Sequence, residues 1–330
     1  MTWNSSKTED PSAPFAVTPD DIRAAHRRIA AHVRRTPILE TPSPLAGAPP
    51  LSLKLECLQH SGSFKARGAF HNLITRPAPA AGAATASGGN HGAAVAYAAD
   101  KLGVPAKVFV PKISTPAKVA RIRACGADAV VGGANYAEAQ MRCDAYVATS
   151  GALKIHPYDA RETVAGAGTV ALEWEEDLER LGLPALDTVL VAVGGGGLIS
   201  GVAAWFAGRI KVVGVEPEGS QALRAAFHAG KPVDVPVQSV AADSLGASRV
   251  GDLNFAIARR FVGEAVVVAD AAILEAQRWL WRQASVVAEP GGATALAALI
   301  GGAYRPETNE RVGVLVCGAN ADLATFAALF

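Results

Sequence analysis

The sequence predicts an α/β protein with two open, twisted parallel sheets, each covered by helices on both faces. Short β-branched segments alternate with alanine-rich segments of helical length, which is the pattern of βαβ units. Half of the 330 residues are hydrophobic, enough for a large core, and a chain of this length generally forms roughly two domains. A Pro/Ala/Gly-rich segment at 76–84 interrupts the pattern and is a candidate boundary between them.

The elements before that boundary begin with a helix. Thr18 suits an N-cap and Pro19 suits the first helical position, and two acids follow, so we expect a helix that includes 22–33. Alternating hydrophobicity predicts a strand at 51–55, and composition predicts a helix at 66–74.

Beyond the first boundary, most of the predicted strands are separated by predicted helices along the rest of the chain. Strands are expected at 107–110, 129–131, 188–193, 211–215, 265–268 and 312–316, and helices at 93–102, 116–124, 136–150, 201–207, 271–284 and 292–300.

A second candidate boundary lies near the segment His156-Pro157-Tyr158. Together the two boundaries make 77–155 a smaller α/β domain, inserted into a larger domain built from 1–76 and 156–330. Ligands of open parallel sheets bind beyond the carboxyl ends of the strands, so we expect the site in the cleft between the two domains.

Composition excludes several classes of partner. The net charge is +1 and no basic run is interleaved with aromatic residues, so we expect a small-molecule substrate and no nucleic acid. No segment approaches the length of a membrane span. Residues 1–19 are polar, and four cysteines without a C-x-x-C pair suit a reducing compartment, so a cytoplasmic location is expected.

Lys65 is the candidate catalytic residue. It stands between small residues in the segment from Ser61 to Ala69, where a planar cofactor could reach its amine. The pKa of a lysine falls readily on burial, which suits the amine to Schiff-base formation with an aldehyde. The alternative interpretation is a surface lysine just before a helix.

A glycine run after a predicted strand is a candidate phosphate site. Four glycines followed by Leu198 lead into a helix, so backbone N–H groups and the helix N-terminus could bind an anion. The run departs from G-x-G-x-x-G at its last position, yet Glu216 follows at the distance of a ribose-binding acid, which leaves NAD as an alternative.

Two further turns contain side chains or backbone groups that could bind a substrate or cofactor. The loop from Ser87 to Gly92 precedes a helix and could bind a carboxylate, while the Asn90 amide could hydrogen-bond a phenolic oxygen. Cys317 begins a turn after the last predicted strand, where a thiol could face a ring nitrogen or be inert. Glu289 opens a helix and could simply favour its dipole.

These four motifs resemble, in the same order and across nearly the whole chain, the fold-type II pyridoxal-phosphate enzymes of the serine/threonine dehydratase and serine racemase branch. The resemblance implies their fold, which is like that of the tryptophan synthase β subunit, a homodimer, and pyridoxal 5'-phosphate as cofactor. It implies that Lys65 is catalytic and holds the cofactor through a Schiff base. The implied cofactor-binding residues are Phe64, Lys65, Asn90, Gly194, Gly195, Gly196, Gly197, Leu198, Glu289 and Cys317, and the implied substrate-binding residues are Ser87, Gly88, Gly89, Asn90 and His91.

Three departures from the family pattern narrow the expected activity. The serine that racemases place two residues before Asn90 is Gly88 here, with Ser87 displaced by one. Glu216 matches one ligand of the family's divalent-cation site, but Ala222 replaces the other, so no metal is expected. Ser244 stands where many relatives have glycine, and nothing in the sequence explains it.

We therefore expect β-elimination of a β-hydroxy amino acid, such as L-threonine or L-serine, to a 2-oxo acid and ammonia. The resemblance implies that the Cys317 thiol faces the cofactor nitrogen and leaves it unprotonated, and the weaker electron sink that results favours elimination. The alternatives are an amino-acid racemase on the same scaffold and an NAD-dependent oxidoreductase.

Overall fold

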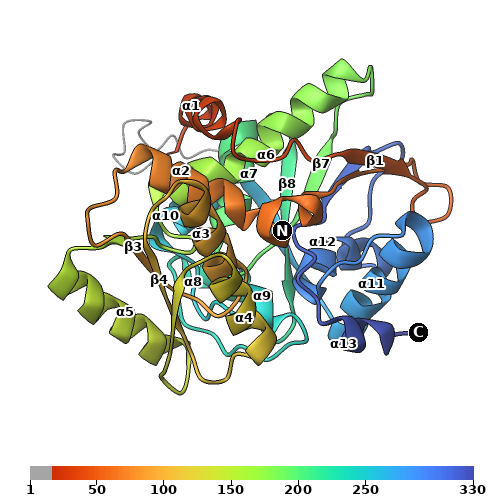
Figure 1. The fold of residues 1–330 in the computed structure, drawn as a ribbon. Coiled ribbons are helices and arrows are strands. Elements are labelled where there is room, and N and C mark those ends of the chain that lie inside the picture. Colours follow the sequence, from red (N-terminus) through yellow and green to blue (C-terminus); the bar gives the residue numbers. More distant parts are fainter. Residues whose placement is uncertain (1–16) are drawn as a thin grey trace.

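The computed structural model describes residues 17–330, which form two sheets (Figure 1). The larger sheet has the order β1 (Ile38–Thr41), β2 (Leu51–Lys54), β10 (Val312–Leu315), β7 (Thr188–Ala192), β8 (Lys211–Pro217) and β9 (Val262–Val268). The smaller sheet has the order β5 (Asp128–Val131), β4 (Ala106–Val110), β3 (Ala83–Ala86) and β6 (Leu153–Lys154). Every neighbouring pair is parallel except β1 and β2, so the predicted fold class is confirmed.

Helices cover both sheets. Their bounds are α1 (Pro19–Ile29), α2 (Lys65–Thr75), α3 (Asn90–Lys101), α4 (Pro116–Ala124), α5 (Tyr136–Ser150), α6 (Arg161–Arg180), α7 (Gly197–Phe206), α8 (Ala222–Ala229), α9 (Ala242–Leu245), α10 (Asp252–Phe261), α11 (Asp270–Ala284), α12 (Pro290–Ile300) and α13 (Leu323–Ala327), with short 3-10 turns at Glu56–Leu58 and His60–Gly62. No helix in residues 17–330 is long and apolar enough to cross a membrane.

The two sheets come from different parts of the chain. All four strands of the smaller sheet lie between residues 83 and 154, and the strands of the larger sheet come from both sides of that stretch. In Figure 1 the smaller sheet and α5 lie on the left, and α11, α12 and α13 lie on the right. This arrangement supports our proposal that residues 77–155 form an inserted domain.

The first helix begins as predicted and ends earlier. Thr18 and Asp21 form a capping box, in which the Thr18 hydroxyl accepts from the Asp21 N–H at 3.2 Å. The helix ends at Ile29, because a tight turn closed by the His32 N–H and the Ile29 carbonyl replaces its last predicted turn. The polar stretch at 1–16, on which the cytoplasmic expectation partly rests, lies outside the described residues.

Several strands and helices were not predicted, namely β1, β3, β6, α6, α8, α9, α10 and α13, and two of them show why. Strand β3 was placed partly in the linker, because its Ala-Ala-Thr-Ala sequence lacks β-branched character, yet it is buried along its whole length. Helix α6, 20 residues long, was missed because it is buried on nearly every side and so has no clear amphipathic period.

Helix α6 packs unusually close to its neighbours, which explains its glycines. A Cβ added at Gly166 would lie 2.7 Å from the Arg67 carbonyl oxygen on α2, and one at Gly201 on α7 would lie 2.5 Å from the Gly168 nitrogen. Only glycine allows backbones to approach this closely. Helix α6 therefore fixes the positions of α2 and α7, which begin at Lys65 and at the end of the glycine run.

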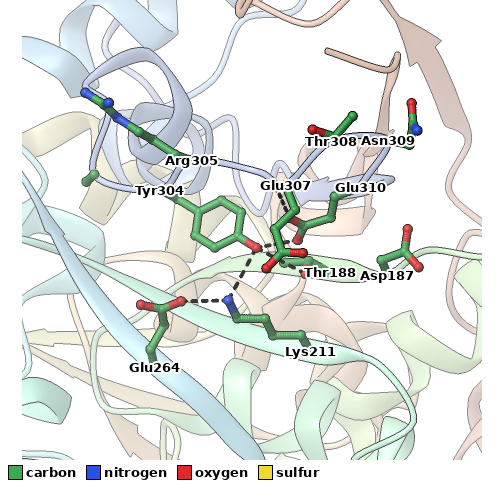
Figure 2. Close-up of a pocket in the computed structure, with 11 residues that line it drawn as sticks. Asp187, Thr188, Lys211, Glu264, Tyr304, Arg305, Glu307, Thr308, Asn309 and Glu310 are labelled. Carbon is green, nitrogen blue, oxygen red and sulfur yellow. Dashed lines mark hydrogen bonds and ion pairs between the residues drawn. The ribbon is translucent and has the colours of Figure 1, made fainter. Parts of the chain in front are cut away.

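A polar pocket lies at the edge of the larger sheet where β7, β8 and β9 begin (Figure 2). Lys211 pairs with Glu264 at 2.9 Å and approaches the Tyr304 hydroxyl at 3.5 Å. That hydroxyl donates to Glu310 and also lies 3.3 Å from Thr188. These groups bond to one another, so we interpret the pocket as a polar network that stabilises this edge of the sheet. It lies at the opposite end of the strands from their carboxyl ends, where we expect the site.

We predict that Gly201→Ala destabilises the protein. The new methyl would meet backbone on α6, and overpacking of this kind costs about 1–3 kcal/mol, more than the roughly 0.5–1 kcal/mol that alanine gains over glycine within a helix. Urea unfolding should show a lower midpoint. Gly263→Ala is the control, because its nearest neighbour is the flexible Lys211 side chain at 3.3 Å; equal midpoints for both variants would contradict the packing account.

Candidate active site

Lys65 is the first residue of α2, and its amine is surrounded by protein although the residue as a whole is half-buried. Its Nζ donates to the Pro157 carbonyl oxygen at 2.7 Å and lies 5.0 Å from the centre of the Phe64 ring. Burial lowers the pKa of this amine from 10.5 to about 8. The uncharged, nucleophilic form of Lys65 is therefore far more populated near neutral pH than that of an exposed lysine.

The loop before Lys65 pairs with the turn that contains Cys317. The Phe64 N–H donates to the Cys317 carbonyl at 3.1 Å, the Ala319 N–H donates to the Gly62 carbonyl at 2.9 Å, and Ser63 forms an antiparallel bridge with Gly318. Two motifs that lie about 250 residues apart in the sequence are thus held side by side by backbone hydrogen bonds.

The Cys317 thiol is buried beside the start of α12. Its Sγ donates to the Gly291 carbonyl at 3.4 Å, and burial raises the pKa of the thiol. Cys317 is therefore a neutral hydrogen-bonding group. A neutral thiol is what we expect opposite an unprotonated ring nitrogen.

Asn90 is held by two side chains from distant segments. Its Nδ2 donates to Glu289 Oε1 at 2.5 Å, and its Oδ1 accepts from Asn320 Nδ2 at 2.5 Å. The same Asn320 amide donates to the Ser61 carbonyl at 2.9 Å. Burial raises the pKa of Glu289 to about 7, although Asn90 donates to it. Glu289 therefore holds the Asn90 side chain, in addition to standing at the start of helix α12.

The glycine run forms a turn at the start of α7. Gly196 has φ +92, in the left-handed region. The Tyr158 ring covers the run, since a Cβ at Gly195 would lie 2.4 Å from that ring and one at Gly197 would lie 3.0 Å from the Tyr158 Cα. Within residues 17–330, no protein group accepts from the backbone N–H groups of 194–198, so these donors could bind a phosphate.

The predicted carboxylate loop lines a pocket with Glu289. Gly88, Gly89 and Asn90 form one side of this pocket, and Lys118 and Arg121 of α4 form another. The Ser87 hydroxyl accepts from the Gly89 N–H at 3.2 Å.

A second cavity contains Lys65. It is lined by Lys65, Phe64, His91 and Gly197, among others. His91 is buried with Nε2 3.2 Å from the Ile155 carbonyl, and burial lowers its pKa to about 3, so the ring stays neutral. The structure thus brings the lysine, the glycine run, the carboxylate loop and the cysteine turn into one region.

Several residues of this region were not predicted from the sequence. Pro157 and Tyr158 were noted only as part of a boundary, and no role was considered for Asn320 or Ser114. Ser114 follows β4, and its hydroxyl oxygen is 2.0 Å from the position that a Cβ at Gly88 would occupy. No local motif marks these residues, because only the tertiary fold brings them to the site.

Glu216 does not reach the site. Its carboxylate is buried and accepts from the N–H groups of Leu223 at 2.7 Å and Arg224 at 2.8 Å, at the start of α8. Burial also raises its pKa to about 7. Glu216 thus caps helix α8, although the NAD and divalent-cation hypotheses both need it as a ligand-binding residue.

The donor set fits a planar aldehyde that carries a phosphate: a desolvated amine, free backbone N–H groups at a helix start and a neutral thiol. The model for the family "Pyridoxal-phosphate dependent enzyme" matches residues 29–318. The chain belongs to this family.

Three comparisons illustrate the relationship. The chain is 41% identical to phenylserine dehydratase from Ralstonia pickettii, over 93% of this chain and 94% of that protein. It is 36% identical to L-threonine ammonia-lyase from Geobacter sulfurreducens, over 92% of this chain and 76% of that protein. The solved structure of maize serine racemase aligns with TM-score 0.86 and 33% identity, over 95% of this chain and 96% of that chain. The predicted family, cofactor and lyase class are confirmed.

We predict that the reactivity of Lys65 titrates with a midpoint near pH 8 in the cofactor-free protein, because burial lowers its pKa to about 8. The rate of Lys65 acylation, followed by peptide mass spectrometry, should rise with pH below this value and level off above it. Exposed lysines in the same digest are the control, since their ordinary pKa is about 10.4. A Lys65 profile that superimposes on theirs would disprove its desolvation.

Proposed function

We propose that this enzyme eliminates the β-hydroxyl group of a β-hydroxy amino acid, such as L-threonine or L-serine, and yields a 2-oxo acid and ammonia. The observation that carries the proposal is the buried Lys65 amine, whose pKa is lowered, held in one region with free N–H donors, Asn90 and the neutral Cys317 thiol. The dehydratases and ammonia-lyases among the relatives support the same reaction class.

The residues of the site divide the binding task. The backbone N–H groups of 194–198 would hold the cofactor phosphate, Asn90 its ring hydroxyl and Cys317 its ring nitrogen. When bound, pyridoxal phosphate supplies the electron withdrawal that makes the substrate α-proton acidic. The Ser87–His91 loop would bind the substrate carboxylate and thereby orient the Cα–H bond.

Lys65 would move the proton. Its neutral amine would accept the α-proton, and the β-hydroxyl would leave together with a proton, so that the substrate loses one water overall. The unsaturated amino acid that remains after this elimination is then hydrolysed to the 2-oxo acid and ammonia. The amine must be both uncharged and close to the substrate, which burial at the start of α2 provides.

Two finer parts of the proposal concern the setting of the enzyme. The family resemblance supports a homodimer. The four cysteines are all free in the structure, which supports a reducing, cytoplasmic location.

We predict that borohydride reduction of the cofactor-loaded protein attaches the cofactor to Lys65, and that Lys65→Ala abolishes both attachment and turnover. Mass mapping locates the attachment, and keto-acid and ammonia assays with L-serine, L-threonine and 3-phenylserine measure turnover. The exposed Lys231 provides the control variant Lys231→Ala, which should retain both properties. Attachment at another lysine would refute the assignment.

A second candidate function is racemisation of the same substrates. One observation favours it: the Ser114 hydroxyl lies beside Gly88, where the racemase-type sequence would place a serine side chain. Another segment therefore supplies a hydroxyl next to the carboxylate loop, and an acid–base group facing the substrate opposite Lys65 is what racemisation requires.

If Ser114 returns protons, Ser114→Ala should lower the formation of D-serine from L-serine by at least about tenfold while keto-acid formation changes little. Deuterium incorporation in recovered substrate and chiral chromatography measure both. Ser87→Ala tests the neighbouring hydroxyl in parallel. Wild-type enzyme that forms keto acid without any D-serine would exclude this second function.

A further inference from the structure

A cluster of buried charges includes one residue of α2, the helix that begins at Lys65, and takes no part in the chemistry described above. It consists of Lys54, Glu56, Arg67, Glu173 and Asp177, whose side chains are between 0% and 4% exposed. Lys54 pairs with Glu173 at 2.8 Å and with Asp177 at 3.2 Å, and Arg67 pairs with Glu56 at 2.7 Å and with Glu173 at 3.0 Å.

Stability alone does not account for such a cluster. Removing charges from water is costly, and well-packed apolar side chains often replace a buried ion pair without loss of stability. What ionic hydrogen bonds provide and apolar contacts do not is direction, because a bidentate pair fixes both distance and angle.

Arg67 has this directional contact. Its Nε donates to Glu56 Oε2 at 2.8 Å and its Nη2 donates to Glu56 Oε1 at 2.7 Å. Arg67 lies in the first turn of α2, two residues after Lys65, and that helix has no side-chain N-cap of its own.

Glu56 is tied to the strand that leads to Cys317. It follows β2, which pairs with β10, and the next residue, Cys57, donates its N–H to the Val316 carbonyl at 2.8 Å. The Arg67–Glu56 pair thus connects the turn that carries Lys65 to the end of β10 that carries Cys317.

We propose that Arg67 is a positioning residue: its bidentate pair with Glu56 holds the first turn of α2 so that the Lys65 amine keeps a fixed, dry place relative to Cys317. The inference rests on the proposed function only in taking Lys65 as the cofactor-binding amine. Borohydride mapping of the wild-type protein tests that assignment separately.

The test compares Arg67→Lys with Asp177→Asn. Arg67→Lys keeps the charge and loses the paired geometry, so kcat should fall by at least about tenfold with KM nearly unchanged. The midpoint of Lys65 acylation in the cofactor-free protein should rise, because a less constrained amine is better hydrated. Asp177→Asn perturbs the same cluster without touching Arg67 or Glu56, and should leave kcat and the Lys65 midpoint unchanged.

A purely structural role would change these readouts differently. Both variants would lose thermal stability, while kcat and the Lys65 midpoint would stay at wild-type values in Arg67→Lys, and that result would overturn the proposal. If Arg67→Lys does not fold, Glu56→Gln decides, because it keeps the Arg67–Glu173 contact and removes the charge of the paired carboxylate. An unchanged kcat and an unchanged Lys65 midpoint in Glu56→Gln would equally contradict the inference.

Discussion

The removal of the Lys65 amine from water is the constraint on which the rest of the site depends. Burial lowers its pKa to about 8, and the amine sits at the start of α2, where the helix dipole also disfavours a positive charge. The Pro157 carbonyl accepts its hydrogen bond without adding a countercharge that would restore the ammonium. The neutral Cys317 thiol and neutral His91 belong to the same dry, weakly charged environment.

Segments far apart in the sequence must meet around that amine, and backbone contacts bring them together. The loop at 61–64 pairs with the turn at 317–320, and Asn90 joins both through Asn320 while it donates to Glu289. Small residues make this convergence possible. A Cβ at Gly318 would lie 2.0 Å from the Glu289 carboxylate, so a side chain there would displace the group that holds Asn90.

Much of the fold could be predicted from the sequence, because strands such as β7 and β8 are rich in valine and α1 carries its capping residues. Strand β3 and helix α6 escaped prediction, because alanine and glycine there serve tertiary packing and give no local periodicity. The motifs around Lys65, Asn90, Gly194 and Cys317 were visible because each is contiguous. Tyr158, Asn320 and Ser114 were not, since their contacts depend on distant segments.

The most direct test of the central claim, that a dry Lys65 amine carries the cofactor between the glycine run and the cysteine turn, is a crystal structure of the cofactor-loaded protein. We expect continuous density from Lys65 Nζ to the cofactor, its phosphate within hydrogen-bonding distance of the N–H groups of 194–198, and its ring nitrogen facing Cys317. A cofactor bound to another lysine, or with its phosphate away from the glycine run, would contradict the account.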